Sequence, residues 1–543
     1  MNNLQTFDNI YANLAQSAYR KRPLTFSELD SILKVEEIDY SVDEMYENTT
    51  VFGGQNLPNN GIVYLQPDPT KKVLYKKVDS HVITGGKNHV ETFDVYENEK
   101  GLLSDRVKGF NAYFLTDTPT LTNDTKETYL AIRGSDGFRF ALHDVQLPLN
   151  DWLDNNEPFI MSDAYIPQAK LTHEAITVKV QELKTYAPSA QLNITGHSLG
   201  SINAAQAVAN LDAHTLERIN KVVLFHGPDV MKSLKKMGLS EEQIKRASEK
   251  VEYFLNPFDI VSMANRDVPE NEQFGKTHII VPLHYKGTFD DGVAHDFGDL
   301  QMDSKGNILV ATPDFHPELI EAGEKISRLT RKYIDIVKSK GGTYLTAITE
   351  GLKALLEKQV EYQYNVEVKY LLDEFKKEYD AIIQETRQQS LEWNYANIPL
   401  LQERILKATG EQEIMLRQQL VLSAAQLATF ENEDRINQVK TLLKQYKEQV
   451  YHLVHKVHQQ VYGLGKHLNH YELENLISNF QLHTFWRDDI ESEMISNMDK
   501  FQVDIEQFSQ TLVKAAEQMV MLDKGQGQSF EEIMTTVQER WRK

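Results

Sequence analysis

The 543-residue chain contains no cysteine, and it has almost no proline in its second half. Without cysteine there are no disulfide bonds, no thiolate catalysis and no zinc site with cysteine ligands. Of the 16 prolines only Pro399 lies beyond Pro317. Because proline lacks an N–H and clashes with the preceding helical turn, this proline-poor tract, rich in Glu, Gln, Lys and Leu, predicts long helices. We therefore expect two domains, residues 1–316 and residues 317–543.

Positive charge is also scarce. The chain has 58 Lys and Arg against 79 Asp and Glu, a formal net charge of -21. This balance argues against nucleic acid or an anionic membrane surface as an electrostatic partner. No apolar run approaches the length of a membrane span, so we expect no transmembrane segment.

The N-terminus, residues 1–20, has no basic region followed by an apolar one, which predicts no cleaved secretory signal. If the chain is exported, we expect a route that needs none. Apolar side chains recur there at helical spacing and predict an amphipathic helix: Leu4, Phe7, Ile10, Tyr11, Leu14 and Ala18.

The second half carries apolar residues at steps of three and four, the pattern of a coiled-coil seam. The clearest run is Ile436, Val439, Leu443, Tyr446, Val450, Leu453 and Val457, and a second runs from Leu352 to Phe375. Expected breaks are Gly341-Gly342, the region of Pro399, Gly463 to Gly465, and Gly525 to Gly527. The pattern predicts an elongated, all-α bundle.

The first half alternates short β-rich runs with helical patterns. The expected strands are 129–132, 192–195, 222–225, 251–254 and 278–281, and the clearest helices are 173–186 and 202–211. Alternation of strand and helix predicts an α/β domain with a mostly parallel sheet and helices on its faces.

One motif in this half points to catalysis. Gly196-His197-Ser198-Leu199-Gly200 follows an apolar strand and opens a helix of small residues. A G-x-S-x-G pattern in this position predicts a nucleophile elbow, in which Ser198 is exposed at the carboxyl edge of the sheet. A serine hydroxyl needs a base to remove its proton.

In such domains the acid and then the histidine follow the serine along the chain. Asp259 follows the expected strand 251–254 and is the predicted acid. The possible bases are the histidines that come next, His278, His284, His295 and His316. We favour His295, because it lies in a loop after the last expected strand, with His284 as the alternative.

The oxyanion of an acyl-transfer reaction needs two backbone donors. Leu199 N–H, directly after the nucleophile, is one expected donor. Ser135 N–H, in the segment that follows strand 129–132, is the other.

Taken together, these segments resemble the class 3 lipases of the α/β-hydrolase fold. The similar stretches are Ala131 to Asp136, Asn150 to Asn155, Leu224 to Pro228, Ile194 to Gly200 and Asn256 to Val261, and the resemblance covers roughly residues 1–312. The sequence departs from the family pattern at Ser135, usually threonine, and at Ser201, usually glycine. The resemblance implies a lipid-ester hydrolase. We expect no cofactor and no metal.

The order of the two halves is similar to that of antibacterial lipase toxins of type VII secretion, with an LXG-like helical targeting domain placed after the enzyme. This second resemblance implies phospholipase A-type activity, secretion, small helical helper proteins on residues 317–543, and an immunity protein. Two alternatives stay open. One is a non-lipid esterase, and the other is a largely helical adaptor whose α/β half binds without catalysis.

Overall fold

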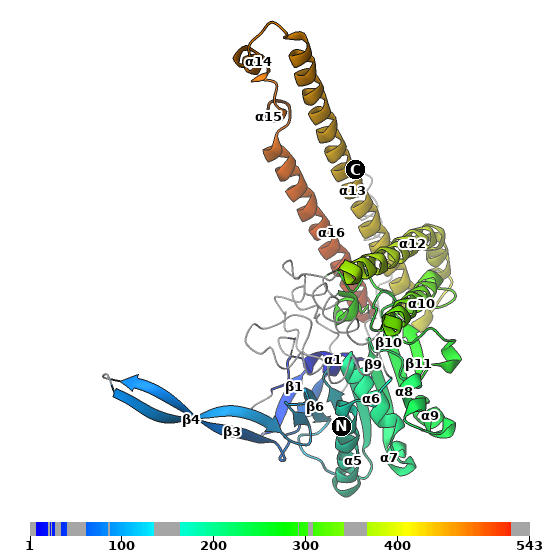
Figure 1. The fold of residues 1–543 in the computed structure, drawn as a ribbon. Helices are drawn as coiled ribbons and strands as arrows, with labels where there is room; N and C mark the ends of the chain where they lie inside the picture. Colours follow the sequence, from blue (N-terminus) through cyan, green and yellow to red (C-terminus); the bar gives the residue numbers. More distant parts are fainter. Residues whose placement is uncertain are drawn as a thin grey trace. The chain divides into compact units, whose positions relative to one another are not determined.

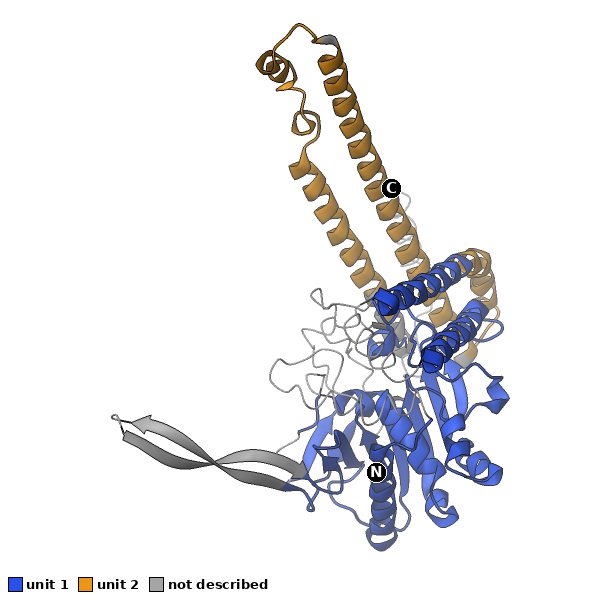
Figure 2. Cartoon of the chain, in the orientation of Figure 1, with its two compact units in different colours: residues 1–390 blue, residues 391–543 orange. Residues whose placement is uncertain are grey.

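A computed structural model describes residues 7–19, 22, 24–27, 34–40, 61–84, 87–134, 163–290, 293–301, 308–340 and 366–522. The chain forms two compact units, Met1–Ser390 and Leu391–Lys543 (Figure 2). The composition shift at Pro317, where we expect the domain boundary, is the start of a helix inside the first unit.

The first unit is built on a mixed sheet whose parallel part has the order β11-β10-β9-β8-β7. Figure 1 labels β11, β10 and β9 of this part. These strands are β7 (Glu127–Ile132), β8 (Gln191–His197), β9 (Ile219–Phe225), β10 (Val251–Leu255) and β11 (Lys276–Ile279), and each neighbouring pair is parallel. The sequence-based strands therefore fall in this parallel part, as predicted. Parallel strands bring the residues after β8 and β10 to the same edge of the sheet.

The sheet continues beyond β7 as antiparallel strands that the sequence analysis does not predict. They are β6 (Phe110–Thr116), β5 (Ser104–Asp105), the long β4 (Lys87–Lys100) and β3 (Lys72–Thr84), and β2 (Ile62–Leu65) joins β6 to β1 (Glu36–Asp39). Strands β3 and β4 contain many charged residues, which hide them in the sequence, whereas β2 and β6 are as apolar as the parallel strands and are missed for want of a helix between them.

Helices cover both faces of the parallel strands. Helix α1 (Phe7–Ser17) lies against β7, β8 and β9, and its apolar side chains share a buried cluster with the alternate strand residues Tyr129, Ala131, Val223 and Phe225. The residues between them point to the opposite face, which α5 (Pro167–Tyr186) and α6 (Leu199–Ala209) cover. Both the amphipathic N-terminal helix and the α/β architecture are thus confirmed.

Shorter elements complete this part of the first unit. They are α7 (Ala213–Glu217), α8 (Met231–Lys236), α9 (Glu241–Ser248) and the 3-10 turns η3 (Glu270–Glu272), η4 (Val293–His295) and η5 (Phe297–Asp299). Helix α9 begins with a capping box, in which Ser240 and Gln243 satisfy each other's backbone N–H groups.

Two long helices follow in the first unit. Helix α10 (Pro317–Lys340) and the first part of α12 (Val366–Ile405) pair through Lys332 and Tyr333, which both contact Glu378 at 2.8–2.9 Å. Tyr333 also stacks edge-on against Phe375, with ring centroids 5.1 Å apart. The expected break at Gly341-Gly342 lies outside the described residues.

Helix α12 corrects one prediction, because Pro399 lies inside it and does not end it. An interior proline costs a helix about 3 kcal/mol. Here apolar side chains on both sides of the proline, among them Ile398 and Leu401, pack into one cluster with Leu416 and Leu420. This packing offsets the cost, and the break falls later, at Gly410 with its φ of +63°.

The second unit is all helical in its described part. After the end of α12 it contains α13 (Glu411–Leu464), α14 (His470–Ile477), α15 (Leu482–Phe485) and α16 (Asp488–Leu522), and α13 runs alongside α16 (Figure 1). Helix α13 ends where predicted, with Gly465 as its C-cap. The expected break at Gly525 to Gly527 lies outside the described residues. No helix in the described part of the chain is long and apolar enough to cross a membrane.

The predicted seam of α13 is covered only in part: Ile436 is 5% exposed, but other members are not covered. Val439, Tyr446 and Leu453 are 39%, 55% and 62% exposed, whereas Val454 is buried at 7%. At the positions next to the expected ones, Lys440 and Lys447 reach across to acidic residues of α16, Asp499 and Glu491, at 2.5 and 2.6 Å. The side of α13 that faces α16 therefore carries lysines as well as apolar residues, and a three-four apolar pattern does not predict such positions.

Candidate active site

The nucleophile candidate stands at a sharp turn between β8 and α6. Ser198 has φ +57° and ψ -125°, a strained backbone conformation for a residue with a side chain. Close packing holds it there, because a Cβ on Gly196 would lie 2.6 Å from the Gly200 carbonyl oxygen and one on Gly200 would collide with that of Ile132. The two glycines of the motif are thus required by the neighbouring backbone, as the elbow geometry predicts.

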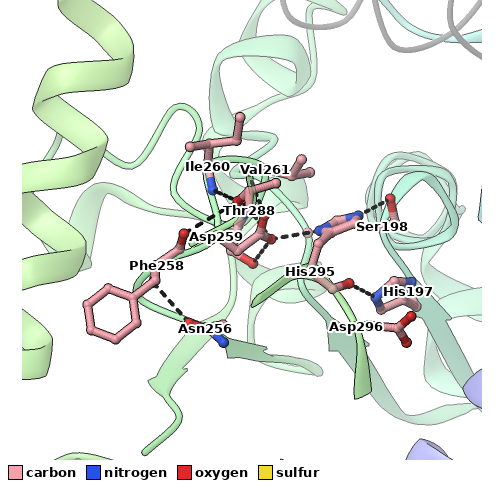
Figure 3. A network of polar contacts seen from close by, with 12 residues as sticks. His197, Ser198, Asn256, Phe258, Asp259, Ile260, Val261, Thr288, His295 and Asp296 are labelled. Carbon is pink, nitrogen blue, oxygen red and sulfur yellow. Dashed lines mark hydrogen bonds and ion pairs between the residues drawn. The ribbon is translucent and has the colours of Figure 1, made fainter. Parts of the chain in front are cut away.

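Three predicted residues meet at this edge of the sheet (Figure 3). Ser198 Oγ lies 2.8 Å from His295 Nε2, and His295 Nδ1 lies 2.8 Å from Asp259 Oδ2. A carboxylate only accepts hydrogen bonds, so Nδ1–H donates to Asp259 and Nε2 accepts from the serine hydroxyl. This arrangement has the connectivity of a serine-hydrolase triad.

His284, the alternative base, is buried, and its backbone N–H donates a hydrogen bond to the Asp299 carboxylate. His278 stacks on Phe254 at 5.0 Å, and His316 binds Glu318 at 2.7 Å. Among the four histidines considered from the sequence, the structure places His295 between Ser198 and Asp259.

Asp259 is fully buried and hydrogen bonded on both oxygens. Oδ2 accepts from Ser262 N–H at 2.9 Å and from its hydroxyl at 2.5 Å, and Oδ1 accepts from Val261 N–H at 3.1 Å and Thr288 Oγ–H at 3.2 Å. Burial favours the neutral acid, but the charge and hydrogen bond of His295 and the bond from Ser262 hold the pKa of Asp259 below its ordinary value. The carboxylate stays ionised and fixed in direction.

The same interaction acts on the base. Burial by itself lowers the pKa of a histidine, but the Asp259 carboxylate, with Asp296 nearby, brings the pKa of His295 above its ordinary value. An imidazole that binds protons more tightly is a stronger base toward the serine hydroxyl.

Two further histidines lie beside His295. The rings of His197 and His226 are 5.1 and 6.3 Å from that of His295, between centroids. Burial lowers the pKa of His226 to about 4 and puts the pKa of His197 well below its ordinary value, and a positive His295 lowers both further. The two are therefore neutral near pH 7, and positive charge in the cluster is confined to His295.

His197 also binds the backbone of His295. Its Nε2–H donates to the His295 carbonyl oxygen at 2.8 Å, and its Nδ1 accepts from the Tyr19 hydroxyl at 2.8 Å. Arg22, near Tyr19, forms an ion pair with Asp296 at 2.6 Å. The N-terminal region thus holds the segment that carries His295 from two sides.

Of the two expected oxyanion donors, the structure describes Leu199 but not Ser135. Leu199 is buried at the first turn of α6, where helix geometry directs N–H groups out of the helix end. Ser135 lies outside the described residues, as does the stretch Asn150 to Asn155. Gly134 is described, and a Cβ there would lie 3.3 Å from the Leu199 nitrogen. The chain leading to Ser135 therefore passes beside the elbow.

Sequence reasoning missed the groups that hold the triad in place. Ser262, three residues after Asp259, has the spacing of a local side-chain-to-backbone turn and could have been found. Thr288 and Tyr19 reach the site from remote segments, and nothing local in the sequence marks them. Among the described residues, no group of three or more acidic or histidine side chains could hold a metal ion.

The fold and the hydrogen-bonded Ser198, His295 and Asp259 are those of an α/β-hydrolase. Residues 129–265 match the model of the class 3 lipase family, Lipase (class 3), which supports a lipid ester hydrolase. No curated protein and no solved structure matches the chain. The matched stretch is shorter than residues 1–312, over which the sequence resembles the family. The match includes Ser198 and Asp259 but ends before His295, so the family model does not bear on the histidine.

The raised pKa of His295 predicts the pH dependence of activity. Only the neutral imidazole accepts the serine proton, so kcat/KM should fall as the pH drops through this pKa, at a higher pH than for an isolated histidine. Asp259→Asn should lower kcat by roughly a thousandfold or more and move this acid limb to lower pH.

The measurement is the pH profile of ester hydrolysis for the wild type, Asp259→Asn and a control, Asp267→Asn. Asp267 pairs with Lys232 at 3.1 Å and has no contact with the triad. An acid limb that stays at the wild-type pH in Asp259→Asn would show that this carboxylate does not set the pKa of the base.

Proposed function

We propose that the chain is a serine carboxylic-ester hydrolase that cleaves lipid esters. The proposal is carried by one observation, the continuous hydrogen bonds from Ser198 through His295 to Asp259 at the elbow after β8. The class 3 lipase match over residues 129–265 supports lipid esters as the substrate class.

The proposed reaction has two steps. Ser198 Oγ attacks the ester carbonyl carbon while His295 Nε2 takes the hydroxyl proton, and Asp259 stabilises the imidazolium. The negative oxygen of the tetrahedral intermediate binds the N–H groups of Leu199 and Ser135. His295 then protonates the leaving alcohol, which gives an acyl-enzyme. Water, deprotonated by His295, releases the fatty acid and restores Ser198.

We further propose phospholipid as the substrate, with phospholipase A-type cleavage. The support is the resemblance of the whole chain to antibacterial lipase toxins, together with the lipase match. A net charge of -21 disfavours electrostatic adsorption to an anionic bilayer, so recognition of the acyl chain has to come from apolar groups near the elbow.

Two matched histidine variants test the chemistry. Ser198→Ala and His295→Ala should each reduce acyl release from mixed phospholipids and triglycerides by roughly 10⁴-fold or more, while His284→Ala retains turnover. The products are read by mass spectrometry, which also identifies the ester bond cleaved. Loss of activity in His284→Ala alone would overturn the assignment of the base. Turnover confined to soluble short esters would favour the non-lipid esterase.

For the helical half, residues 317–543, we propose an LXG-like targeting role. In this proposal small helical helper proteins bind this half, export uses a type VII secretion system without a cleaved signal, and a separate immunity protein protects the producing cell. The support is the resemblance and an exposed apolar stripe on α13. The stripe comprises Val439, Leu442, Tyr446 and Leu453, at helical spacing and 39–62% exposed. An exposed apolar stripe of this kind can bind the apolar face of a partner helix.

Variants of this stripe test whether helper proteins bind it. Small helical proteins should co-purify with the full chain from its native host, and the double variant Leu442→Lys with Leu453→Lys should reduce their recovery at least tenfold. Asn437→Lys, on a different face of the same helix, is the control and should bind normally. Equal recovery with the double variant would place the partner elsewhere or contradict the proposal.

A further inference from the structure

Helix α12, outside the stretch that matches the lipase model, contributes a buried tyrosine to the loops around Asp259. Tyr379 is 0% exposed. Its hydroxyl donates a hydrogen bond to the Phe258 carbonyl oxygen and accepts one from Thr288 N–H at 2.8 Å. One hydroxyl therefore joins two loops that lie 30 residues apart along the chain.

Both loops determine where the Asp259 carboxylate lies. Phe258 directly precedes the acid. Thr288 contacts it through its side chain, since Oγ–H donates to Asp259 Oδ1 at 3.2 Å while Oγ accepts from Ile260 N–H at 3.0 Å (Figure 3). A shift of either loop would alter the direction of the carboxylate toward His295.

The tyrosine ring is fixed by close packing. A Cβ on Gly287 would lie 2.5 Å from ring atom Cε1 of Tyr379, so the loop backbone rests directly on the ring. Phe289 and Phe375 contact the same ring, with centroids 5.5 and 5.9 Å away. Burial raises the pKa of Tyr379, so its hydroxyl keeps its proton. The position is rigid and the donor is permanent.

A second chain of hydrogen bonds joins α12 and α10 to the loop that contains Thr288. Tyr285, whose ring lies 4.8 Å from that of Phe258, donates to Ser390 Oγ at 2.7 Å, and Ser390 donates to Glu318 at 2.5 Å. Glu318 is in α10 and Ser390 is in α12. Both helices therefore bind the segment that follows β11, which leads to His295.

We propose that Tyr379 is a positioning residue for ester hydrolysis, which holds the Phe258 and Thr288 loops so that the Asp259 carboxylate faces His295. This inference rests on the proposed function. It also means that a fragment ending at residue 316 would lack this support, because α10 and α12 as far as Ser390 belong to the first unit.

The test compares Tyr379→Phe with Tyr333→Phe in the full chain. The control removes a hydroxyl from the same helix pair, since Tyr333 donates to Glu378 at 2.9 Å and its ring lies on Phe375, but it has no contact with the Asp259 loops. Rates on a soluble short-chain ester are expressed per active serine, titrated with a fluorophosphonate, so that unfolded molecules are not counted.

Tyr379→Phe should lower kcat roughly tenfold with KM changed by no more than about twofold, because a displaced carboxylate affects the reaction and not the binding of ester. The acid limb of kcat/KM should move to lower pH, since Asp259 would then stabilise the imidazolium less. The other groups facing His295 are unchanged in this variant: Asp296 with its partner Arg22, His197 and His226. Gly287→Ala, which pushes against the ring, should act in the same direction, and Tyr333→Phe should match the wild type.

A wild-type kcat and acid limb in Tyr379→Phe would overturn the proposal. So would equal losses in Tyr379→Phe and Tyr333→Phe with no shift of the limb, because that result indicates general loosening of the helices. If the wild type itself neither hydrolyses esters nor reacts with the fluorophosphonate, the proposed function fails, and this inference fails with it.

Discussion

The buried hydrogen bond between Asp259 and His295 is the interaction on which the site depends. A fully buried carboxylate is costly, and here its cost is offset by the imidazole and by donors from Val261, Ser262 and Thr288. The result is a carboxylate that stays charged and an imidazole with a raised pKa. Tyr19 and Arg22 contact His197 and Asp296, which adjoin the His295 segment, and Tyr379 of α12 contacts the loops around Asp259.

The sequence predicts the reacting groups better than their supports. Ser198 is marked by its motif and by the strand and helix around it, and Asp259 and His295 follow from the order of residues along an α/β chain. The supports leave no such pattern, because they act across long separations: Tyr379 meets Phe258 from 121 positions away, and Tyr19 meets His197 from 178. Periodicity reports neighbours within one element and cannot report these contacts.

The helical half shows the same limit. Long helices follow from scarce proline and from apolar spacing, yet the helix passes through Pro399 because side chains on both sides of it pack together. In α13, Ile436 is buried as predicted, but Lys440 and Lys447 face α16 where Val439 and Tyr446 are expected. An apolar pattern cannot predict that lysines lie on the covered side of a helix. The compact units divide after Ser390, and the change in composition at Pro317 coincides with the start of α10 inside the first unit.

If Ser198 is the nucleophile and His295 activates it, Ser198 should react covalently with a serine-directed reagent. The most direct measurement is reaction of the full chain with a fluorophosphonate, followed by peptide mass spectrometry. We expect one phosphonyl group per chain, on the peptide that contains Ser198, and much slower labelling in His295→Ala. Labelling of another serine, or equal labelling rates in the wild type and His295→Ala, would contradict this expectation.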